Sequence, residues 1–598
     1  MNIFLNIATA MLLMSCGGTE DTPTGGGSDK PDTPVVPVTP TVEEVTSDIS
    51  LLLSTDKCAY LPGEEVKFSV KGAVPSDARV RYRQGFDVIA DAALSDRSWT
   101  WKTPAKDFTG YMAEIYQNVG EKKVKVLGTI AVDVSSDWTM FPRYGFVATF
   151  SSDKTDAVVE SEMEWLNRCH INGVQFQDWH LSHHWPCPID KDGNLMTEFK
   201  DIANRTNCTS VIKRYIDVQH SLGMKSIFYN LAFGVLKDAY DDGVKEEWNL
   251  YKQPNRNERD KHPLPDSWKS DIYLVNPANA EWQQYIGDRN EEVYQNFDFD
   301  GYQIDQLGYR GTLYDYDGNQ VVLPQGYTSF INAMKERHPD KRLIMNAVSS
   351  YGTKEIASTG KVDFCYNEVW DSEKRYVDLY NIIRENDRNS EGGRALKTVF
   401  AAYMDYNRDR CDFNIPGILL TDAVMMSLGG QHLELGDHML CREYFPYTGV
   451  RMSGDLKTAI EHYYDFQVAF QNLLRGGGKE VSMKVSSSQA VINQWPPVAH
   501  SVSSFAREYG NMNVVHLINF TNSNAESWRD ADGKEQAPLL RSKLPITVES
   551  TKKVKRVWCA SPDEHGGSVL ELVFTQDGSS VAFTLPTLKY WTMIVLEY

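Results

Sequence analysis

The sequence predicts a multidomain protein: a central (β/α)8 TIM barrel, flanked by an N-terminal immunoglobulin-like β-sandwich and a C-terminal β-sandwich. Three observations lead to this prediction. Residues 45–140 alternate apolar and polar residues, residues 141–478 alternate strand-like and helix-like segments, and residues 479–598 return to strand-like runs. Repeated pairs of strand and helix are typical of parallel strands surrounded by helices.

The composition indicates a globular protein with a large core. The chain has 598 residues, of which 41% are hydrophobic and 14 are Trp, so it is long enough for about three domains. The formal net charge of -20 argues against a nucleic acid as partner, because phosphates are bound through Lys and Arg. A neutral polymer such as a polysaccharide is compatible with this charge.

The N-terminus has the pattern of an export signal. Residues 3–14 are apolar but too short to span a bilayer, and Leu13-Met14-Ser15-Cys16 resembles a bacterial lipoprotein box. We expect residues 1–15 to be a signal peptide, Cys16 to carry a lipid, and residues 16–44 to be a disordered tether. The alternative is a signal peptide with an incidental Cys. The lipidated protein is expected at the outer membrane, at the cell surface or facing the periplasm.

Strand signals precede and follow the predicted barrel. Val66, Phe68 and Val70 alternate with polar residues after the turn-forming residues 61–64. Residues 513–520, 553–558 and 592–596 are expected as strands of the second sandwich.

The cysteines beyond Cys16 show no CxxC pair and no zinc-like spacing. We expect most of them to be buried thiols, and the sequence selects no disulfide pair.

The barrel strands are expected as eight short apolar runs, separated by helices with one apolar face. Asn276-Pro277 is expected to open the helix after strand three, and a helix over 416–428 leads to strand eight. Residues 234–276 are too polar for a core and are expected to form a loop over the barrel mouth. The expected strands are 144–150, 173–178, 225–230, 297–308, 342–346, 362–368, 398–403 and 429–436.

Polar residues at the ends of these strands are the candidates for chemistry, because the strand ends and the following loops meet at one face of a barrel. Two carboxylates, Asp305 and Glu368, stand out because each interrupts an otherwise apolar strand. The residues expected to bind substrate around them are Gln175, Asp178, Trp179, His180, Tyr229, Asn230, Gln303, Gln306, Asn346, Trp370, Tyr403, His432 and Glu434.

Paired carboxyls of this kind are typical of glycoside hydrolysis. In retaining enzymes the two groups lie about 5 Å apart, one as nucleophile and one as acid/base. Asp305, deep on strand four with amides nearby, would stay ionised and attack the anomeric carbon. Glu368, beside Tyr366 and Trp370, would have its pKa raised by burial and protonate the leaving oxygen.

Structural roles are the alternatives for several of these residues. Asp305 is also suited to capping a loop, and Glu368 to pairing with Arg375 or Arg310. Asp178 also fits a helix N-cap, and core hydrogen bonding is an equal alternative for His432 and Glu434. Asp298 and Asp300 are expected to pair or cap. His180, His183 and His184 are expected to bind hydroxyls or fill a loop, so no metal site is predicted. Of the aromatic residues, Trp179 and Trp370 are the expected sugar platforms.

Three stretches resemble glycoside hydrolase family 66, whose members are endo-acting dextranases and cycloisomaltooligosaccharide glucanotransferases. They are VQFQDWHLSHHWP at 174–186, FDGYQIDQLG at 299–308 and YNEVW at 366–370. The resemblance covers about residues 45–598. It implies that Asp305 is the nucleophile and Glu368 the acid/base. No cofactor is expected. The resemblance further implies a substrate such as dextran or isomaltooligosaccharides, and a monomer is expected.

The resemblance leaves three functions to compare. The first is a lipid-anchored, retaining endo-α-1,6-glucanase, and the second is a cyclising transglucosylase. The cyclising branch carries an extra module late in its barrel, for which the 33 residues between Val399 and His432 (432 − 399) leave no room. The third is a non-catalytic glycan-binding lipoprotein, which would have no use for paired carboxylates at strand ends. The first is therefore preferred.

Overall fold

The computed structural model describes residues 43–390 and 395–598. The predicted signal peptide, Cys16 and almost all of the tether lie outside the described residues. Within these ranges, no helix has both the length and the apolar character needed to cross a membrane.

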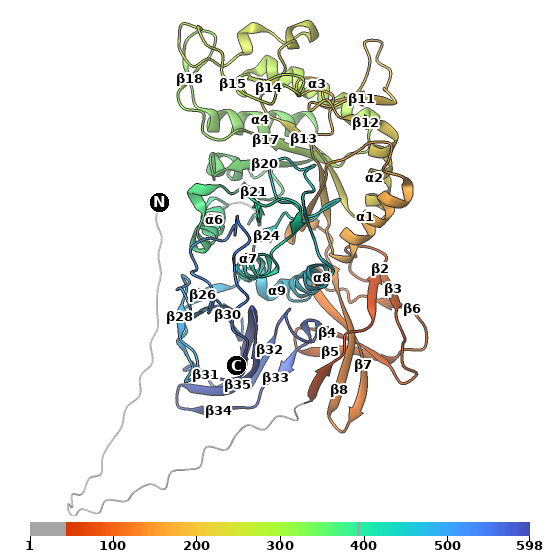
Figure 1. The fold of residues 1–598 in the computed structure, drawn as a ribbon, viewed down its shortest axis with the longest axis vertical. Helices are drawn as coiled ribbons and strands as arrows, with labels where there is room; N and C mark the ends of the chain where they lie inside the picture. Colours follow the sequence, from red (N-terminus) through yellow and green to blue (C-terminus); the bar gives the residue numbers. More distant parts are fainter. Residues whose placement is uncertain (1–42, 391–394) are drawn as a thin grey trace, which may run out of the picture. The chain divides into compact units, whose positions relative to one another are not determined.

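The centre of the protein is an eight-stranded parallel barrel, as predicted (Figure 1). Its last strand returns to its first through a bridge between Phe146 and Gly436 and a 3.1 Å hydrogen bond from the amide of Phe146 to the carbonyl of Leu435, so the barrel is nearly closed. In sheet order the strands are β9 (Tyr144–Val147), β10 (Gly173–Phe176), β13 (Lys225–Leu231), β17 (Gly301–Asp305), β20 (Arg342–Val348), β21 (Cys365–Glu368), β22 (Thr398–Ala401) and β24 (Gln431–His432).

The strands are apolar on both faces because both faces are buried. Their inward side chains form one cluster that includes Tyr144, Phe146, Ile344 and Tyr366, while outward side chains pack against the helices. The helices are α1 (Asp156–Arg168), α2 (Thr209–Ser221), α3 (Ala280–Asn296), α4 (Leu323–Arg337), α5 (Thr353–Ala357), α6 (Tyr376–Asn389), α7 (Ile415–Ser427), α8 (Gly454–Ala469) and α9 (Gln471–Leu474).

Most strand and helix ends differ from the sequence prediction by up to four residues, among them the start of α3 and both ends of the eighth strand. Helix α3 is capped by Asn279, whose side chain accepts from the amides of Glu281 and Trp282 at 3.0 Å each. The predicted cap, Asn276, instead accepts from the amide of Ala278 at 3.0 Å, in a turn before the helix. The eighth strand is only two residues long, because the chain leaves the ladder after His432.

The excursion between β13 and α3 carries structure of its own. It contains a three-stranded sheet of β14 (Gly234–Val235), β16 (Ile272–Leu274) and β15 (Lys261–His262). Part of this excursion lines the cavity at the barrel mouth, in agreement with the predicted position. Its three-stranded sheet was not predicted.

The N-terminal region consists of two sheets around one hydrophobic cluster. The cluster includes Val66, Phe68 and Val70 on one sheet and Val80 and Ile130 on the other, as the period of two predicts. An immunoglobulin-like topology stays a prediction. One sheet orders β1 (Glu44–Ser47), β8 (Lys123–Val134), β7 (Thr109–Gly120), β4 (Arg79–Gln84) and β5 (Asp87–Ala93); the other orders β2 (Leu52–Thr55), β3 (Glu65–Lys71) and β6 (Ser98–Lys102).

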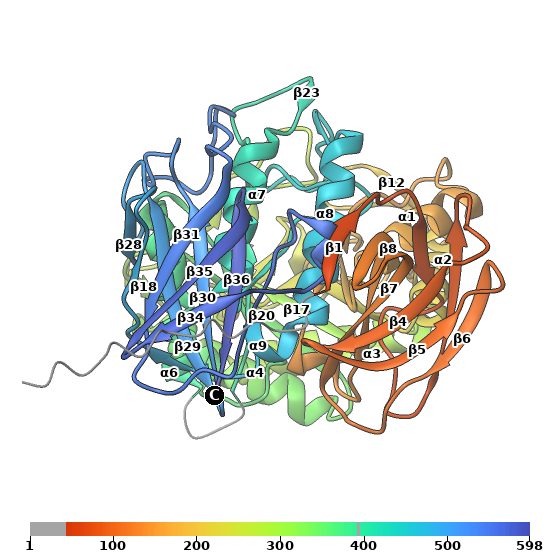
Figure 2. The same ribbon diagram turned by 90° about the horizontal axis from the view of Figure 1, so that it is seen from below.

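The C-terminal region also has two main sheets, coloured blue in Figure 2. A hydrophobic cluster that includes Val515, Ile546, Val581 and Ile594 fills the space between them. The larger sheet contains β26 (Lys479–Val481), β28 (Ile492–Gln494), β29 (Val502–Tyr509), β30 (Met512–Asn519), β36 (Trp591–Glu597), β32 (Arg556–Ala560) and β33 (Leu570–Glu571); the smaller contains β27 (Val485–Ser486), β31 (Arg541–Glu549), β35 (Ser580–Leu588) and β34 (Phe574–Asp577).

Buried polar contacts join the N-terminal region to helix α8 and to the C-terminal region. Asp465 on α8 accepts from the amide of Ala131 on β8 at 2.8 Å, and Thr129 donates to the carbonyl of Gly566 at 2.9 Å. The eight cysteines among the described residues are free thiols, and all but the half-buried Cys411 are buried, as expected.

Candidate active site

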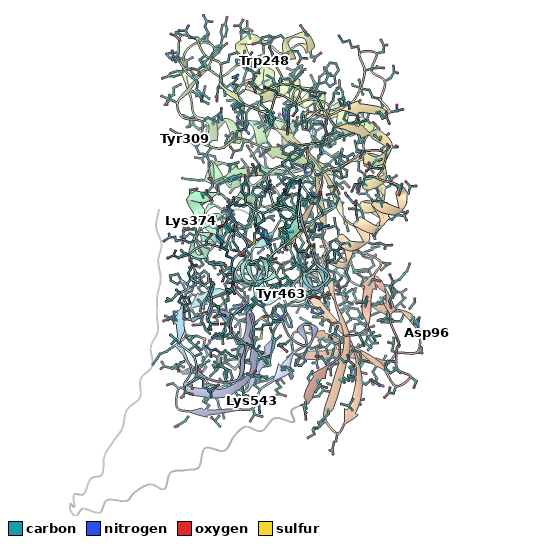
Figure 3. All side chains as sticks on the ribbon, viewed as in Figure 1. Asp96, Trp248, Tyr309, Lys374, Tyr463 and Lys543 are labelled. Carbon is teal, nitrogen blue, oxygen red and sulfur yellow. The ribbon has the colours of Figure 1, made fainter. Side chains whose placement is uncertain are left out.

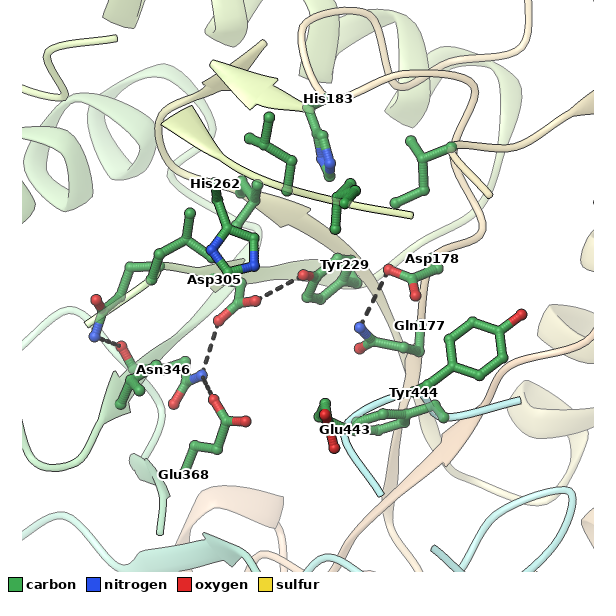
Figure 4. Close-up of a pocket in the computed structure, with 18 of the residues that line it drawn as sticks. Gln177, Asp178, His183, Tyr229, His262, Asp305, Asn346, Glu368, Glu443 and Tyr444 are labelled. Carbon is green, nitrogen blue, oxygen red and sulfur yellow. Dashed lines mark hydrogen bonds between the residues drawn. The ribbon is translucent and has the colours of Figure 1, made fainter. Parts of the chain in front are cut away.

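A cavity of about 820 Å³ opens at the C-terminal ends of the barrel strands. Its wall combines four parts of the chain: the strand ends with the residues just after them, the loop after β10 with His183 and Ile202, the excursion between β13 and α3, and residues 443–445 after β24. Figure 4 shows Asp305, Glu368, Asp178 and Glu443 around this one space. Four carboxyl groups therefore share the cavity.

Asp305 is the last residue of β17 and faces the cavity. Tyr229 Oη donates to its Oδ2 at 2.6 Å, and Asn346 Nδ2 donates to its Oδ1 at 2.8 Å (Figure 4). The pKa of Asp305 is raised on balance by burial, and these two donors and the amide of Gln306 limit the rise. The donors therefore favour the ionised form of a largely buried carboxylate.

Glu368 is the last residue of β21, on the other side of Asn346. The same Asn346 Nδ2 donates to Glu368 Oε2 at 2.9 Å, and Tyr403 Oη donates to Oε1 at 2.8 Å. Burial, together with the negative charge of Asp305, raises the pKa of Glu368 from its ordinary 4.5 to about 7. Glu368 can therefore hold a proton near neutral pH, as a general acid must.

The shared amide fixes the spacing of the two carboxyls. Both hydrogen bonds end on one nitrogen, so the two accepting oxygens lie no farther apart than the bond lengths of 2.8 and 2.9 Å laid end to end, about 5.7 Å. The structural alternatives for Glu368 are wrong, because Arg375 pairs with Asp378 at 3.0 Å and Arg310 with Asp260 at 2.7 Å. Asn346 Oδ1 is buried without a protein partner among the described residues.

Asp178 supplies a third buried carboxyl on the opposite wall. Its backbone is left-handed, with φ of 49°, and no helix begins there, so the N-cap alternative is wrong. Burial raises the pKa of Asp178 to about 7. Asp298 and Asp300 lie away from the cavity, and Asp300 pairs with His220 and Lys225 at 2.9 and 3.0 Å, as expected.

The other predicted residues divide into two groups. Those that line the cavity with the two acids are Gln175, Asp178, Tyr229, Gln303, Gln306, Asn346, Trp370 and Tyr403. Gln175 Oε1 is buried without a protein partner among the described residues, which suits a contact with a hydroxyl. Gln306, in contrast, accepts from the amide of Gly308 at 2.6 Å and so shapes its own loop.

Trp179, His180 and Asn230 lie behind the cavity wall. Trp179 has no exposed surface, packs against Phe228, Phe297 and Phe299, and donates to the carbonyl of Tyr229 at 3.2 Å. His180 and Asn230 both contact His183, at 3.0 and 2.8 Å. The expected sugar contacts of these three residues therefore need correction: their side chains are fully buried against other protein groups, so they support the wall.

His432 and Glu434 also lie in the core instead of the cavity. His432 Nδ1 lies 2.8 Å from Asp422 Oδ1 and 3.3 Å from Glu434 Oε2, and its Nε2 lies 2.8 Å from the carbonyl of Ala402. Burial lowers the pKa of His432, but the two carboxylates raise it further, to well above its ordinary value. Core hydrogen bonding, the alternative considered for both residues, fits this placement. Asp422, His432 and Glu434 each place one atom that could ligate a metal within 4.8 Å of the other two, among the described residues. The 2.8 Å distance from His432 to Asp422 is the length of a hydrogen bond.

Several lining residues had no prediction. Trp268 lies on the excursion, and Glu443 and Tyr444 follow β24. The rings of Trp268 and Tyr444 lie 6.0 Å apart. Residues 443–445 could have been predicted to line the site, because they follow the last barrel strand and loops after the strands meet at that face. No sequence periodicity marks Trp268 as a lining residue.

Comparisons with known proteins agree with this geometry. The sequence model described as glycosyl hydrolase family 66 matches residues 55–595. A cycloisomaltooligosaccharide glucanotransferase of Niallia circulans is 25% identical over 716 aligned positions, covering 91% of this chain and 72% of the relative. A dextranase of Streptococcus salivarius is 25% identical over 566 positions, covering 82% and 67%.

A solved structure has the same fold. It is the crystal structure of a Paenibacillus sp. cycloisomaltooligosaccharide glucanotransferase complexed with cycloisomaltoheptaose, which is 24% identical. It superposes with a TM-score of 0.83 and covers 92% of this chain and 100% of the solved chain.

Proposed function

The chain belongs to glycosyl hydrolase family 66 and is a glycoside hydrolase, and from this premise we propose that it cleaves internal α-1,6-glucosidic linkages of dextran with retention of configuration. The observation that carries the proposal is the single Asn346 amide bonded to both Asp305 and Glu368. The resulting spacing of at most about 5.7 Å is close to the roughly 5–5.5 Å of retaining enzymes. Inverting enzymes keep their carboxyls roughly 6.5–9.5 Å apart, which leaves room for a water.

The environments of the two acids assign their roles. Asp305, with Tyr229 and Asn346 donating to it, attacks the anomeric carbon as the carboxylate. Glu368, with its raised pKa, gives its proton to the departing glycosidic oxygen. In the second half of the reaction Glu368 accepts a proton from water, which attacks the same carbon and releases Asp305.

Hydrolysis is favoured over cyclisation by what the chain lacks relative to the named glucanotransferase. That alignment spans 716 positions but covers 91% of the 598 residues here, about 544, so about 172 positions (716 − 544) of the relative have no counterpart. The dextranase alignment spans 566 positions. Equal identity to both relatives does not discriminate, and the paired acids disfavour the non-catalytic binder.

The test is to incubate the purified protein with dextran and follow polymer size, product structure and anomeric configuration by proton NMR. The proposal predicts a rapid fall in polymer size, linear isomaltooligosaccharides and initial α-anomeric products. Cyclic products would favour the glucanotransferase, and initial β-anomers would exclude a retaining mechanism.

We propose in addition that the protein is exported and anchored by a lipid on Cys16. The sequence Leu13-Met14-Ser15-Cys16 and the tether composition support this proposal. Metabolic labelling with an alkyne fatty acid should mark the wild type and spare Cys16→Ser. Equal labelling of both proteins would refute the anchor.

A further inference from the structure

A segment of the C-terminal region, Trp528–Asp532, contacts the two loops that follow β21 and β22. The amide of Trp528 donates to the carbonyl of Lys374 at 3.1 Å, and its indole donates to the carbonyl of Glu373 at 2.7 Å. Lys374, in the loop after β21, is labelled in Figure 3. The amide of Asp405, in the next loop, donates to the carbonyl of Arg529 at 3.3 Å. The segment is thus fixed to the loops beside Glu368 and Tyr403.

Arg529 in this segment points its guanidinium at two strand ends at once. Nη1 donates to the carbonyl of Tyr403 at 3.0 Å, and Nη2 donates to the carbonyl of Val369 at 2.9 Å. The carboxylate of Asp371 lies 3.7 Å from Nε. Arg529 is 6% exposed, so these bonds are made largely out of water.

These two carbonyls belong to the acid/base half of the site. Val369 follows Glu368 directly, and Tyr403 is the residue whose hydroxyl donates to Glu368. A rigid, planar cation bonded to both strand ends fixes the distance between the acid and its donor. Asp305 and Tyr229 have no comparable contact with Arg529.

The same guanidinium also supports the wall of the cavity on this side. It lies 5.5 Å from the ring of Trp370 and 5.6 Å from the ring of Tyr406. Trp370 lines the cavity, and Tyr406 donates to the lining residue Glu443 at 2.8 Å. One cation therefore contacts four groups around Glu368: the carbonyls of Tyr403 and Val369 and the rings of Trp370 and Tyr406.

We propose that Arg529 is a positioning residue for Glu368, so that the C-terminal region completes the proton-donating half of the active site. This inference rests on the proposed function, because it assumes that Glu368 protonates a leaving oxygen. Loss of Arg529 should impair proton donation more than nucleophilic attack by Asp305.

The test separates these two steps by the choice of leaving group. An isomaltooligosaccharide requires a proton on its leaving oxygen, whereas p-nitrophenyl α-isomaltoside releases a stable phenolate with little need for an acid. For Arg529→Gln in the full chain we expect kcat/KM to fall about 10- to 100-fold on the oligosaccharide. On the aryl substrate we expect a fall of less than about threefold.

Arg507 offers a matched control. It is also a buried arginine of the C-terminal region, and it donates to the carbonyls of Leu474 and Leu428 at 3.1 and 2.7 Å, outside the cavity lining. Arg507→Gln should leave the ratio of the two kcat/KM values unchanged. If Arg529→Gln does not fold, the ratio of the two kcat/KM values is measured in Arg529→Lys instead. Lysine keeps the charge but cannot bond to both carbonyls through a planar guanidinium.

Equal losses on both substrates, unchanged kinetics, or the same change of ratio in Arg507→Gln would each overturn the inference while leaving the proposed function in place. A wild-type protein that cleaves neither substrate would overturn the proposed function, and the inference with it.

Discussion

Asn346 is the residue on which the proposed chemistry depends most directly. Its one amide nitrogen donates to Asp305 and to Glu368, at 2.8 and 2.9 Å. A neutral donor between two acids reduces their repulsion without adding a charge, so one acid can stay ionised while the other keeps its proton. Tyr229 and Tyr403 then distinguish the two acids, because each donates to only one of them.

Removing one tyrosine hydroxyl should shift one limb of the pH–activity profile. Activity requires Glu368 protonated, so kcat/KM falls as pH rises through the pKa of Glu368, near 7. The Tyr403 hydroxyl lowers that pKa, so Tyr403→Phe should move the basic limb to higher pH. Tyr229 lowers the pKa of Asp305, so the matched variant Tyr229→Phe should move the acidic limb to higher pH. A shift of the same limb in both variants would contradict this assignment.

Glu368 should also reduce the stability of the folded protein at neutral and higher pH. Its pKa is raised from 4.5 to about 7 on folding, so the native state holds the proton more tightly, and stability falls as pH rises from about 4.5 to 7. Glu368→Gln should therefore raise the free energy of unfolding at pH 8 by about 1–3 kcal/mol.

At about pH 4 the same substitution should have little effect, because both states of the wild type are then protonated. Urea denaturation at the two pH values measures the difference, with the exposed Glu121→Gln as control. An equal gain at both pH values would show that charge is not the cause.

At the scale of elements, the cavity is built by parts of the chain with different sequence signals. The barrel strands were predictable because burial on both faces demands apolar runs, and polar residues at their ends, such as Asp305 and Glu368, stand out against them. The long excursion and residues 443–445 have no such periodicity, and their place in the wall depends on tertiary packing. Trp179 was misplaced for a related reason: an aromatic residue near a strand end fits a core and a sugar platform equally well.

The contact between Trp268 and Tyr444 joins the excursion to the loop after β24 across the cavity wall. If these rings bind the polymer away from the reacting bond, Trp268→Ala should raise KM for long isomaltooligosaccharides about tenfold with kcat nearly unchanged. Steady-state kinetics over oligosaccharides of increasing length measures this. Tyr240→Ala, an exposed aromatic on the same excursion outside the lining, is the control. An equal loss of kcat for all lengths would contradict a binding role.

At the scale of the whole molecule, one hydrophobic cluster runs through the barrel into both flanking regions. It contains Met112 and Ala131 from the N-terminal sheets and Trp558 and Trp591 from the C-terminal sheets. Trp591 packs against Phe466 of α8, with ring centroids 4.8 Å apart. The flanking regions therefore share their core with the barrel helices. Arg529 of the C-terminal region also contacts the active site, through the carbonyls of Tyr403 and Val369.

A shared core predicts cooperative unfolding. Differential scanning calorimetry of the wild type should show one transition, because exposing the C-terminal sheets also exposes α8 and the barrel core. Trp591→Ala should lower the temperature of that single transition instead of splitting it. Two separated transitions in the wild type would show that the C-terminal region is an independent domain.

The most direct test of the central claim is to identify the carboxylate that becomes bonded to the sugar. A 5-fluoro isomaltosyl fluoride should label the protein in a one-to-one ratio, because the fluorine slows release of the glycosyl-enzyme, and peptide mass spectrometry locates the label. We predict the label on Asp305, with Asp305→Asn unlabelled. A label on Glu368, Asp178 or Glu443, or turnover without any covalent intermediate, would contradict the account.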